Sequence, residues 1–274
     1  MSMKKALMTG LLSITFVIGF SQQGQWIEVR DMETWSSVGF ELDLNKKWSF
    51  SLEEQLRLKS NSTEVDSYFT EFGLLYKGFE HFEFGGNLRY QSINDNKGKI
   101  QGYETHFRYN LDLAYFHKID RFKLKYRIRY QNRNEVGVDE LAGDYAISKW
   151  RLKASVSYNI KKWKLDPTFS AELFRRSQET TVTEFDRVRM TLGTKYDLKK
   201  FGEIKGFYRI EKELNTTYPK TTHIWGLAYV YTLKIKTNGN SKSYSDKAKF
   251  YGQLKIDTES LINLLSESNK LKTQ

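Results

Sequence analysis

Residues 107–130 read FRYNLDLAYFHKIDRFKLKYRIRY and contain two runs in which apolar and polar side chains alternate. In the second run, lysines and arginines separate the apolar side chains of Phe122, Leu124, Tyr126, Ile128 and Tyr130. A period of two is typical of a β-strand with one apolar and one polar face, and Lys118–Arg121 provides the turn of a hairpin. Each run exceeds the roughly five or six residues of a strand in a globular protein. Both match the roughly nine to eleven that cross a membrane as a tilted strand.

The same alternation recurs in paired runs as far as Ile235. Short turns within the pairs alternate with longer polar loops between them, which is typical of outer-membrane barrels with short periplasmic turns. The sequence therefore predicts an all-β, antiparallel transmembrane β-barrel of about 12 strands (10–12) over residues 22–235. A soluble periplasmic β-protein is the alternative.

Aromatic residues gather beside the short turns, several of which contain paired lysines. We expect one periplasmic aromatic girdle composed of Trp48, Tyr76, Phe82, Tyr115, Phe122, Tyr158 and Trp163. A soluble barrel has no physical reason to carry such a ring at one end. The girdle therefore favours the membrane interpretation.

The direction of the chain sets the predicted strand count. A short turn at Asn45 is periplasmic, so the strand before it descends and needs an ascending partner, for which we predict Gln25–Asp31. Twelve strands result, and the last one ends on the periplasmic side near Ile235. The alternative takes Lys249–Asp257 as the twelfth strand.

The two ends of the chain differ from the barrel pattern. Lys4 and Lys5 precede an uncharged, largely apolar run from Ala6 to Phe20, which predicts a signal peptide over residues 1–21, cleaved after Ser21. A short membrane anchor is the alternative. Residues 236–274 are predicted to be a flexible tail with a short amphipathic helix, or a disordered extension.

Composition excludes several classes of protein. The chain has no cysteine, so disulfides and thiolate metal sites are ruled out. Its net charge of +11 falls to +9 when Lys4 and Lys5 leave with the leader. We expect no nucleic-acid partner, because the basic residues occupy alternate strand positions or turns and the leader exports the chain.

No pattern for catalysis, a cofactor or a metal is found. The four histidines are His81, His106, His117 and His223, and no serine lies within two residues of any of them. No His-x-His pair or calcium loop is present. We therefore expect no enzyme activity, no cofactor and no metal; a lipid-modifying hydrolase of the outer membrane is the alternative.

The inward rows carry the chemical content of the predicted barrel. A basic wall facing the lumen is predicted from Lys123, Lys125, Arg127, Arg129, Arg151 and Arg189. If acidic neighbours neutralise this wall, the lumen is a structural salt-bridge ladder; if they do not, the barrel is a narrow, anion-favouring channel. Glu54 departs from the pattern, because its phase points it toward lipid. Either Glu54 is protonated or paired with a neighbour, or the face assignment fails locally.

Ser51–Arg57, the leader and the preceding strand Trp35–Leu44 together resemble an uncharacterised family of outer-membrane β-barrels from Bacteroidetes-like bacteria, catalogued as a domain of unknown function. The resemblance covers roughly Gln25 to Ile235 and implies the bacterial outer membrane as location, with no assigned activity. We expect the partners to be outer-membrane lipid and, during insertion, the barrel-assembly machinery. The sequence does not indicate an oligomeric state.

Overall fold

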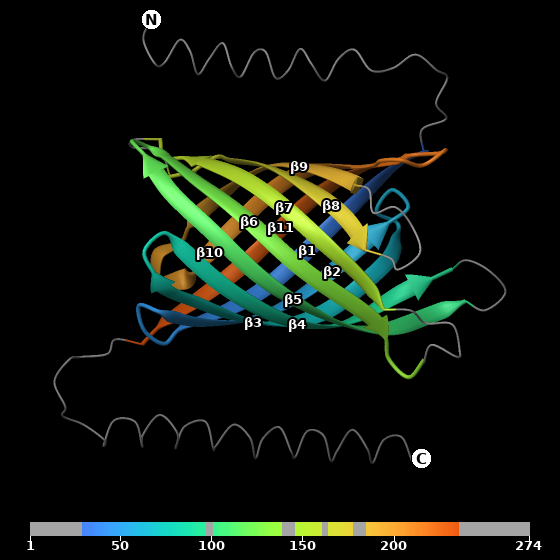
Figure 1. The fold of residues 1–274 in the computed structure, drawn as a ribbon, viewed down its shortest axis with the longest axis horizontal. Helices are drawn as coiled ribbons and strands as arrows, with labels where there is room; N and C mark the ends of the chain where they lie inside the picture. Colours follow the sequence, from blue (N-terminus) through green and yellow to red (C-terminus); the bar gives the residue numbers. More distant parts are fainter. Residues whose placement is uncertain (1–28, 97–100, 139–145, 161–163, 178–184, 236–274) are drawn as a thin grey trace, which may run out of the picture. The chain divides into compact units, whose positions relative to one another are not determined.

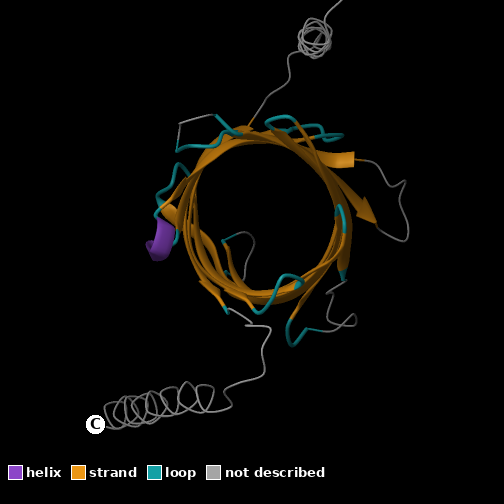
Figure 2. Ribbon diagram, turned by 90° about the vertical axis from the view of Figure 1, so that its left-hand side faces the viewer, coloured by secondary structure: helices purple, strands orange, loops and turns teal. Residues whose placement is uncertain are grey.

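The structure, a computed structural model, describes residues 29–96, 101–138, 146–160, 164–177 and 185–235. Within these residues, eleven strands form a closed barrel (Figures 1 and 2). The strands are β1 (Val29–Asp43), β2 (Trp48–Lys59), β3 (Glu64–Phe79), β4 (Phe82–Asp95), β5 (Gly102–Ile119), β6 (Phe122–Glu135), β7 (Ile147–Tyr158), β8 (Thr168–Ser177), β9 (Phe185–Asp197), β10 (Glu203–Glu213) and β11 (Lys220–Lys234). A 3-10 helix, η2 (Lys199–Phe201), connects β9 and β10.

Consecutive strands pair in antiparallel fashion, and the ring closes where β1 runs parallel to β11. The closing register runs from the Val29–Lys220 pair to the Asp43–Lys234 pair. Closure pairs the backbone N–H and C=O groups of the first and last strands, so no strand edge is left open. The predicted all-β barrel of antiparallel strands is confirmed except at the closing β1–β11 pair, which is parallel.

The predicted count of twelve strands is not confirmed, since the described residues contain eleven. Residues 29–31 were predicted to belong to a separate first strand, but they begin β1, which continues unbroken to Asp43. No proline lies within β1 to interrupt it. An odd count is compatible with closure because the β1–β11 pairing is parallel. Residues 25–28 and the alternative strand Lys249–Asp257 lie outside the described residues.

β8, the partner of β7, begins at Thr168, and before it Leu165 makes an isolated bridge to Tyr196. Pro167 explains the start, because proline has no N–H to donate to a ladder.

The outer face of the barrel is apolar. The predicted outward rows are exposed on strand after strand; Leu111, for example, is 59% exposed and Leu227 is 61% exposed. At the short-turn end, aromatic rings pack across neighbouring strands, with centroid distances of 4.5 Å for Trp48–Tyr76, 5.2 Å for Phe82–Tyr115 and 4.7 Å for Phe122–Tyr158. These pairs confirm six members of the predicted girdle. Trp163 lies outside the described residues.

A second group of aromatic residues, which we did not predict, lies toward the long-loop end. The rings of Tyr130 and Trp150 are 5.1 Å apart, and those of Tyr208 and Trp225 are 4.7 Å apart. The apolar outer band therefore has aromatic contacts on both sides, as interfacial belts do.

Glu54 lies on the outer face, as its phase predicted, and is exposed. Its Oε1 accepts a hydrogen bond of 2.6 Å from the Thr70 hydroxyl on β3, so the expectation of a paired carboxyl is met. In the described residues, no helix combines the length and the apolar character that a membrane span requires. The predicted signal peptide and tail lie outside these residues.

Candidate functional site

The inner face of the barrel holds most of the buried polar and charged side chains among the described residues. They include Glu83, Arg89, Gln91, His106, Arg108, Asn110, Gln131, Arg151, Ser170, Glu172 and Glu211. A buried charge is costly unless it is paired and hydrogen bonded. The partners of these groups therefore decide what the lumen can do.

Glu172 on β8 is shared by three arginines. Its Oε1 lies 2.9 Å from Arg127 on β6, and both of its oxygens lie about 3 Å from Arg151 on β7. Arg189 on β9 approaches Oε2 at 3.5 Å. The side chain of Glu172 is only 3% exposed. The Glu172 carboxylate therefore links β8 to three other strands. Its single charge cannot neutralise all three arginines.

Two further carboxylates extend this network around the lumen. Glu71 on β3 accepts hydrogen bonds from Arg89 at 2.6 Å and from Arg108 at 3.1 Å. Glu211 on β10 pairs with Arg189, which thereby connects Glu211 to Glu172. All these groups lie on the inner face, so the ion pairs cross-link the wall at mid-height.

The structure places the predicted basic wall on the inner face and brings its arginines into contact with carboxylates from other strands. Arg129 donates two hydrogen bonds of 2.6 Å each to Asp112, and Lys125 pairs with Glu83. Lys123 differs from the rest, because its Nζ lies over the ring of Phe116, 5.4 Å from the centroid. Five of the six wall cations therefore contact a carboxylate, and three of them share Glu172.

Aromatic side chains on the inner face stack against the arginines. Trp35 is 7% exposed and Phe69 is 1% exposed. The Arg57 guanidinium lies 3.8 Å from the centroid of the Trp35 ring, and that of Arg89 lies 3.3 Å from the centroid of Phe69. At these distances a guanidinium is attracted to the ring face, and more strongly where water is excluded. Rings and guanidinium groups therefore pack against one another on the inner face of the wall.

A glycine makes room for one of these rings. Phe207 on β10 lies opposite Gly226 on β11, and a Cβ at Gly226 would come within 2.4 Å of three Phe207 ring atoms. Trp35 meets Phe207 edge to face, with 6.5 Å between centroids and 81° between planes. Gly226 therefore lets an aromatic ring lie flat against the barrel wall beside Trp35.

Arg57, Lys153 and Arg209 are among the inner-face cations that make no ion pair with a carboxylate of the described residues. Arg57 donates a hydrogen bond to Gln55 at 2.7 Å, and Arg209 donates one to Thr191 at 3.0 Å. Both also contact the Trp35 ring. Positive charge is thus in local excess within the lumen.

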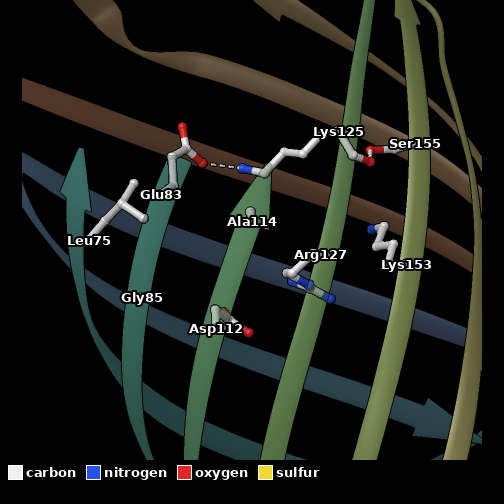
Figure 3. Close-up of a pocket in the computed structure, with 9 residues that line it drawn as sticks. All are labelled: Leu75, Glu83, Gly85, Asp112, Ala114, Lys125, Arg127, Lys153 and Ser155. Carbon is white, nitrogen blue, oxygen red and sulfur yellow. Dashed lines mark hydrogen bonds and ion pairs between the residues drawn. The ribbon is translucent and has the colours of Figure 1, made fainter. Parts of the chain in front are cut away.

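A pocket of about 230 Å³ lies between the Glu172 network and the short-turn end (Figure 3). It is lined by Leu75, Glu83, Gly85, Asp112, Ala114, Lys125, Arg127, Lys153 and Ser155. The charged residues of the pocket project from β4, β5, β6 and β7, and the Lys125–Glu83 ion pair lies along one side of the pocket.

Glu104, His106 and Glu135 form a cluster that our sequence analysis missed. His106 lies directly opposite Glu135 in the β5–β6 register, and one ligand atom from each of the three residues falls within 4.8 Å of the others. Carboxylate oxygens and an imidazole nitrogen are metal-ligand types. The signal in the sequence was the Glu-x-His spacing, which puts Glu104 and His106 on one face of β5. That Glu135 joins them follows only from the pairing with β6.

The histidines considered for a hydrolase lie apart from one another. His106 is buried on the inner face, whereas His223 on β11 lies 2.7 Å from the Tyr208 hydroxyl.

The inward aromatic residues were detectable from phase. Trp35, Phe69, Phe174 and Phe207 each occupy a position of the polar row, one residue away from the outward apolar row. Which arginine stacks on which ring depends on the register between strands, and that information is not contained in a single strand.

Among solved structures, a similar one is titled "NanC porin structure in rhombohedral crystal form". It is 12% identical, the match covers 67% of this chain and 87% of the porin chain, and the TM-score is 0.41. A likeness at this level supports no inference about activity. No curated protein matches the chain.

The family model described as "Protein of unknown function (DUF2490)" matches residues 32–222. The match extends from β1 to the start of β11 and so contains Trp35, Glu71, Glu172 and Glu211. It covers most of the chain. The chain therefore belongs to the DUF2490 family of proteins of unknown function.

Proposed function

We propose that this chain is an integral β-barrel of the bacterial outer membrane whose lumen is closed by ion pairs and aromatic rings, giving it a structural role. One observation carries the proposal: apolar side chains are exposed around the outside of the barrel, while charged ones are buried within. Soluble proteins bury apolar groups, whereas membrane barrels reverse the two faces. The aromatic contacts at both ends of the outer band support the same conclusion.

The targeting part of the proposal comes from sequence. We propose export by a signal peptide cleaved after Ser21, insertion by the barrel-assembly machinery of a Gram-negative, Bacteroidetes-like cell, and contact with outer-membrane lipid. The short turns then face the periplasm.

Cell fractionation tests the location. The mature chain is expected in the outer-membrane fraction, released only by detergent, and as a band that migrates differently in unboiled and boiled gel samples. Recovery of the mature chain from the periplasm without detergent would favour a soluble β-protein and overturn the proposal.

A narrow anion-favouring channel is the second candidate, favoured by the cations without carboxylate partners, Arg57, Lys153 and Arg209. Planar-bilayer recordings separate the two. A closed lumen passes no steady current, whereas a channel passes anions, and Arg127→Glu combined with Arg129→Glu weakens or reverses that preference. In a closed lumen the same double change lowers stability, because it places carboxylates beside Glu172 and Asp112.

We also propose that the chain is not an enzyme. The alternative, a lipid-modifying hydrolase, predicts altered acyl chains in cells that lack the gene. Restoration by the intact gene but not by His106→Ala or His223→Ala would establish the enzyme. Unchanged lipids support the structural role.

A further inference from the structure

The pocket in Figure 3 contains one cation whose charge is not balanced by the protein. Lys153 on β7 lies opposite Glu172 in the β7–β8 register and opposite Arg127 in the β6–β7 register. Glu172 is nonetheless engaged by three arginines, and Lys153 makes no ion pair with a carboxylate of the described residues. Its ammonium therefore remains beside a like charge.

The other charges of the pocket are already committed. Glu83 pairs with Lys125, and Asp112 accepts hydrogen bonds from Arg129 and Asn87, which both lie outside the pocket. Arg127 shares Glu172 with two other arginines, so its charge is only partly offset. Lys153 adds a further positive charge, and the pocket is therefore left with an excess of positive charge.

The pocket also has the size and donors for an anion. Its volume of about 230 Å³ greatly exceeds the roughly 10–15 Å³ that one water needs. The ammonium of Lys153 and the guanidinium of Arg127 are donors without acceptor capacity, whereas the Ser155 hydroxyl already donates to the carbonyl oxygen of Lys125 at 3.2 Å. Leu75, Gly85 and Ala114 offer no side-chain acceptor that would compete for these donors.

We propose that this pocket binds a small oxyanion, phosphate or carboxylate, held by Lys153 with Arg127. A half-buried ammonium beside a guanidinium is stabilised when an anion joins both, since charge-assisted hydrogen bonds are about twice as strong as neutral ones.

This inference rests on the lumen of the proposed barrel but not on conduction or membrane location. The test uses the full mature chain, refolded in detergent, with binding followed by the thermal unfolding midpoint. Sodium phosphate and sodium acetate are titrated separately at ionic strength held constant with sodium chloride. At least one is expected to raise the midpoint saturably, since a ligand that binds only the folded state stabilises it.

Lys153→Gln is the decisive variant, and it is expected to weaken binding about tenfold or more, as loss of a hydrogen bond to a charged group does. Lys153→Arg keeps the charge and should retain binding. Lys195→Gln is the matched control: Lys195 is another inner-face lysine, 2.7 Å from Glu203 and outside the pocket, and its loss should leave binding unchanged.

Lys153→Glu removes the cation and places a carboxylate in the pocket, opposite Glu172. It should abolish the response to the oxyanion. Two results would overturn the site: no saturable response of the wild type to either anion, or equal affinity in wild type and Lys153→Gln. Fractionation and bilayer recording report on the barrel proposal separately, so failure of one is distinguishable from failure of the other.

Discussion

The two faces of the barrel wall are built from the same strands at the same period of two, yet different forces hold them. On β5, Leu111 and Leu113 point outward and are exposed. Asn110 precedes this pair and Ala114 follows it, and their side chains are only 1% and 3% exposed. The outer face needs only apolar surface that suits lipid. The inner face needs specific partners, because each buried charge requires an opposite charge or donor. Substitutions on the inner face should therefore lower the stability strongly, whereas the cost of substitutions on the outer face should depend on their position along the strand.

Glu172→Gln should produce the largest effect, because it removes the carboxylate shared by Arg127, Arg151 and Arg189. Breaking a buried pair by removing one partner costs about 3–5 kcal/mol. Urea unfolding in lipid vesicles, followed by tryptophan fluorescence, measures the loss. Glu203→Gln is the control: its partners Lys195 and Lys205 are both more than 40% exposed, so a loss below about 1 kcal/mol is expected. Equal losses would contradict the contrast between buried and exposed pairs.

Trp35→Ala should rank second, with a loss of about 3 kcal/mol, the lower end for a buried tryptophan because nearby side chains can partly fill the space. It removes the ring that Arg57, Arg209 and Phe207 contact. Trp225→Ala is the control, since Trp225 is 56% exposed on the outer face. The same unfolding assay applies, and a greater loss at Trp225 would contradict the inner aromatic layer.

Leu111→Arg tests the outer face and should cost about 2 kcal/mol in vesicles, as arginine does near the middle of the lipid-facing band. The same change at Tyr103, near the long-loop end of β5, should cost less than about 1 kcal/mol. A flat profile along the strand would mean that no lipid contacts this face.

Glu54→Leu should have the smallest effect, a gain of less than about 1 kcal/mol. The change replaces an outward carboxyl by an apolar group but gives up the 2.6 Å hydrogen bond from Thr70. Unfolding in vesicles of Glu54→Leu and of Glu54→Leu combined with Thr70→Val separates the two contributions. A loss above about 1 kcal/mol would show that the carboxyl is needed where it lies.

The sequence predicted the outer face well, because the alternation of apolar and polar residues can be recognised within a single strand. The alternation in residues 107–130 is sufficient to assign Leu111 outward and Arg108 inward, and both assignments hold. The inner face could be predicted only as a list of charges. That Glu172 serves three arginines while Lys153 has no carboxylate partner depends on the register of four strands and on side-chain reach. The β1–β11 closure, on which the strand count depends, likewise joins residues about 190 positions apart.

The most direct test of the two-faced wall is a nitroxide scan of β5 in lipid vesicles. The chain has no cysteine, so a single introduced cysteine carries the only label. Leu111→Cys and Leu113→Cys should place the label where lipid-soluble oxygen reaches it more readily than a water-soluble nickel complex does. Asn110→Cys and Ala114→Cys should be protected from oxygen. An outer face reached by the nickel complex as freely as by oxygen would contradict the membrane barrel.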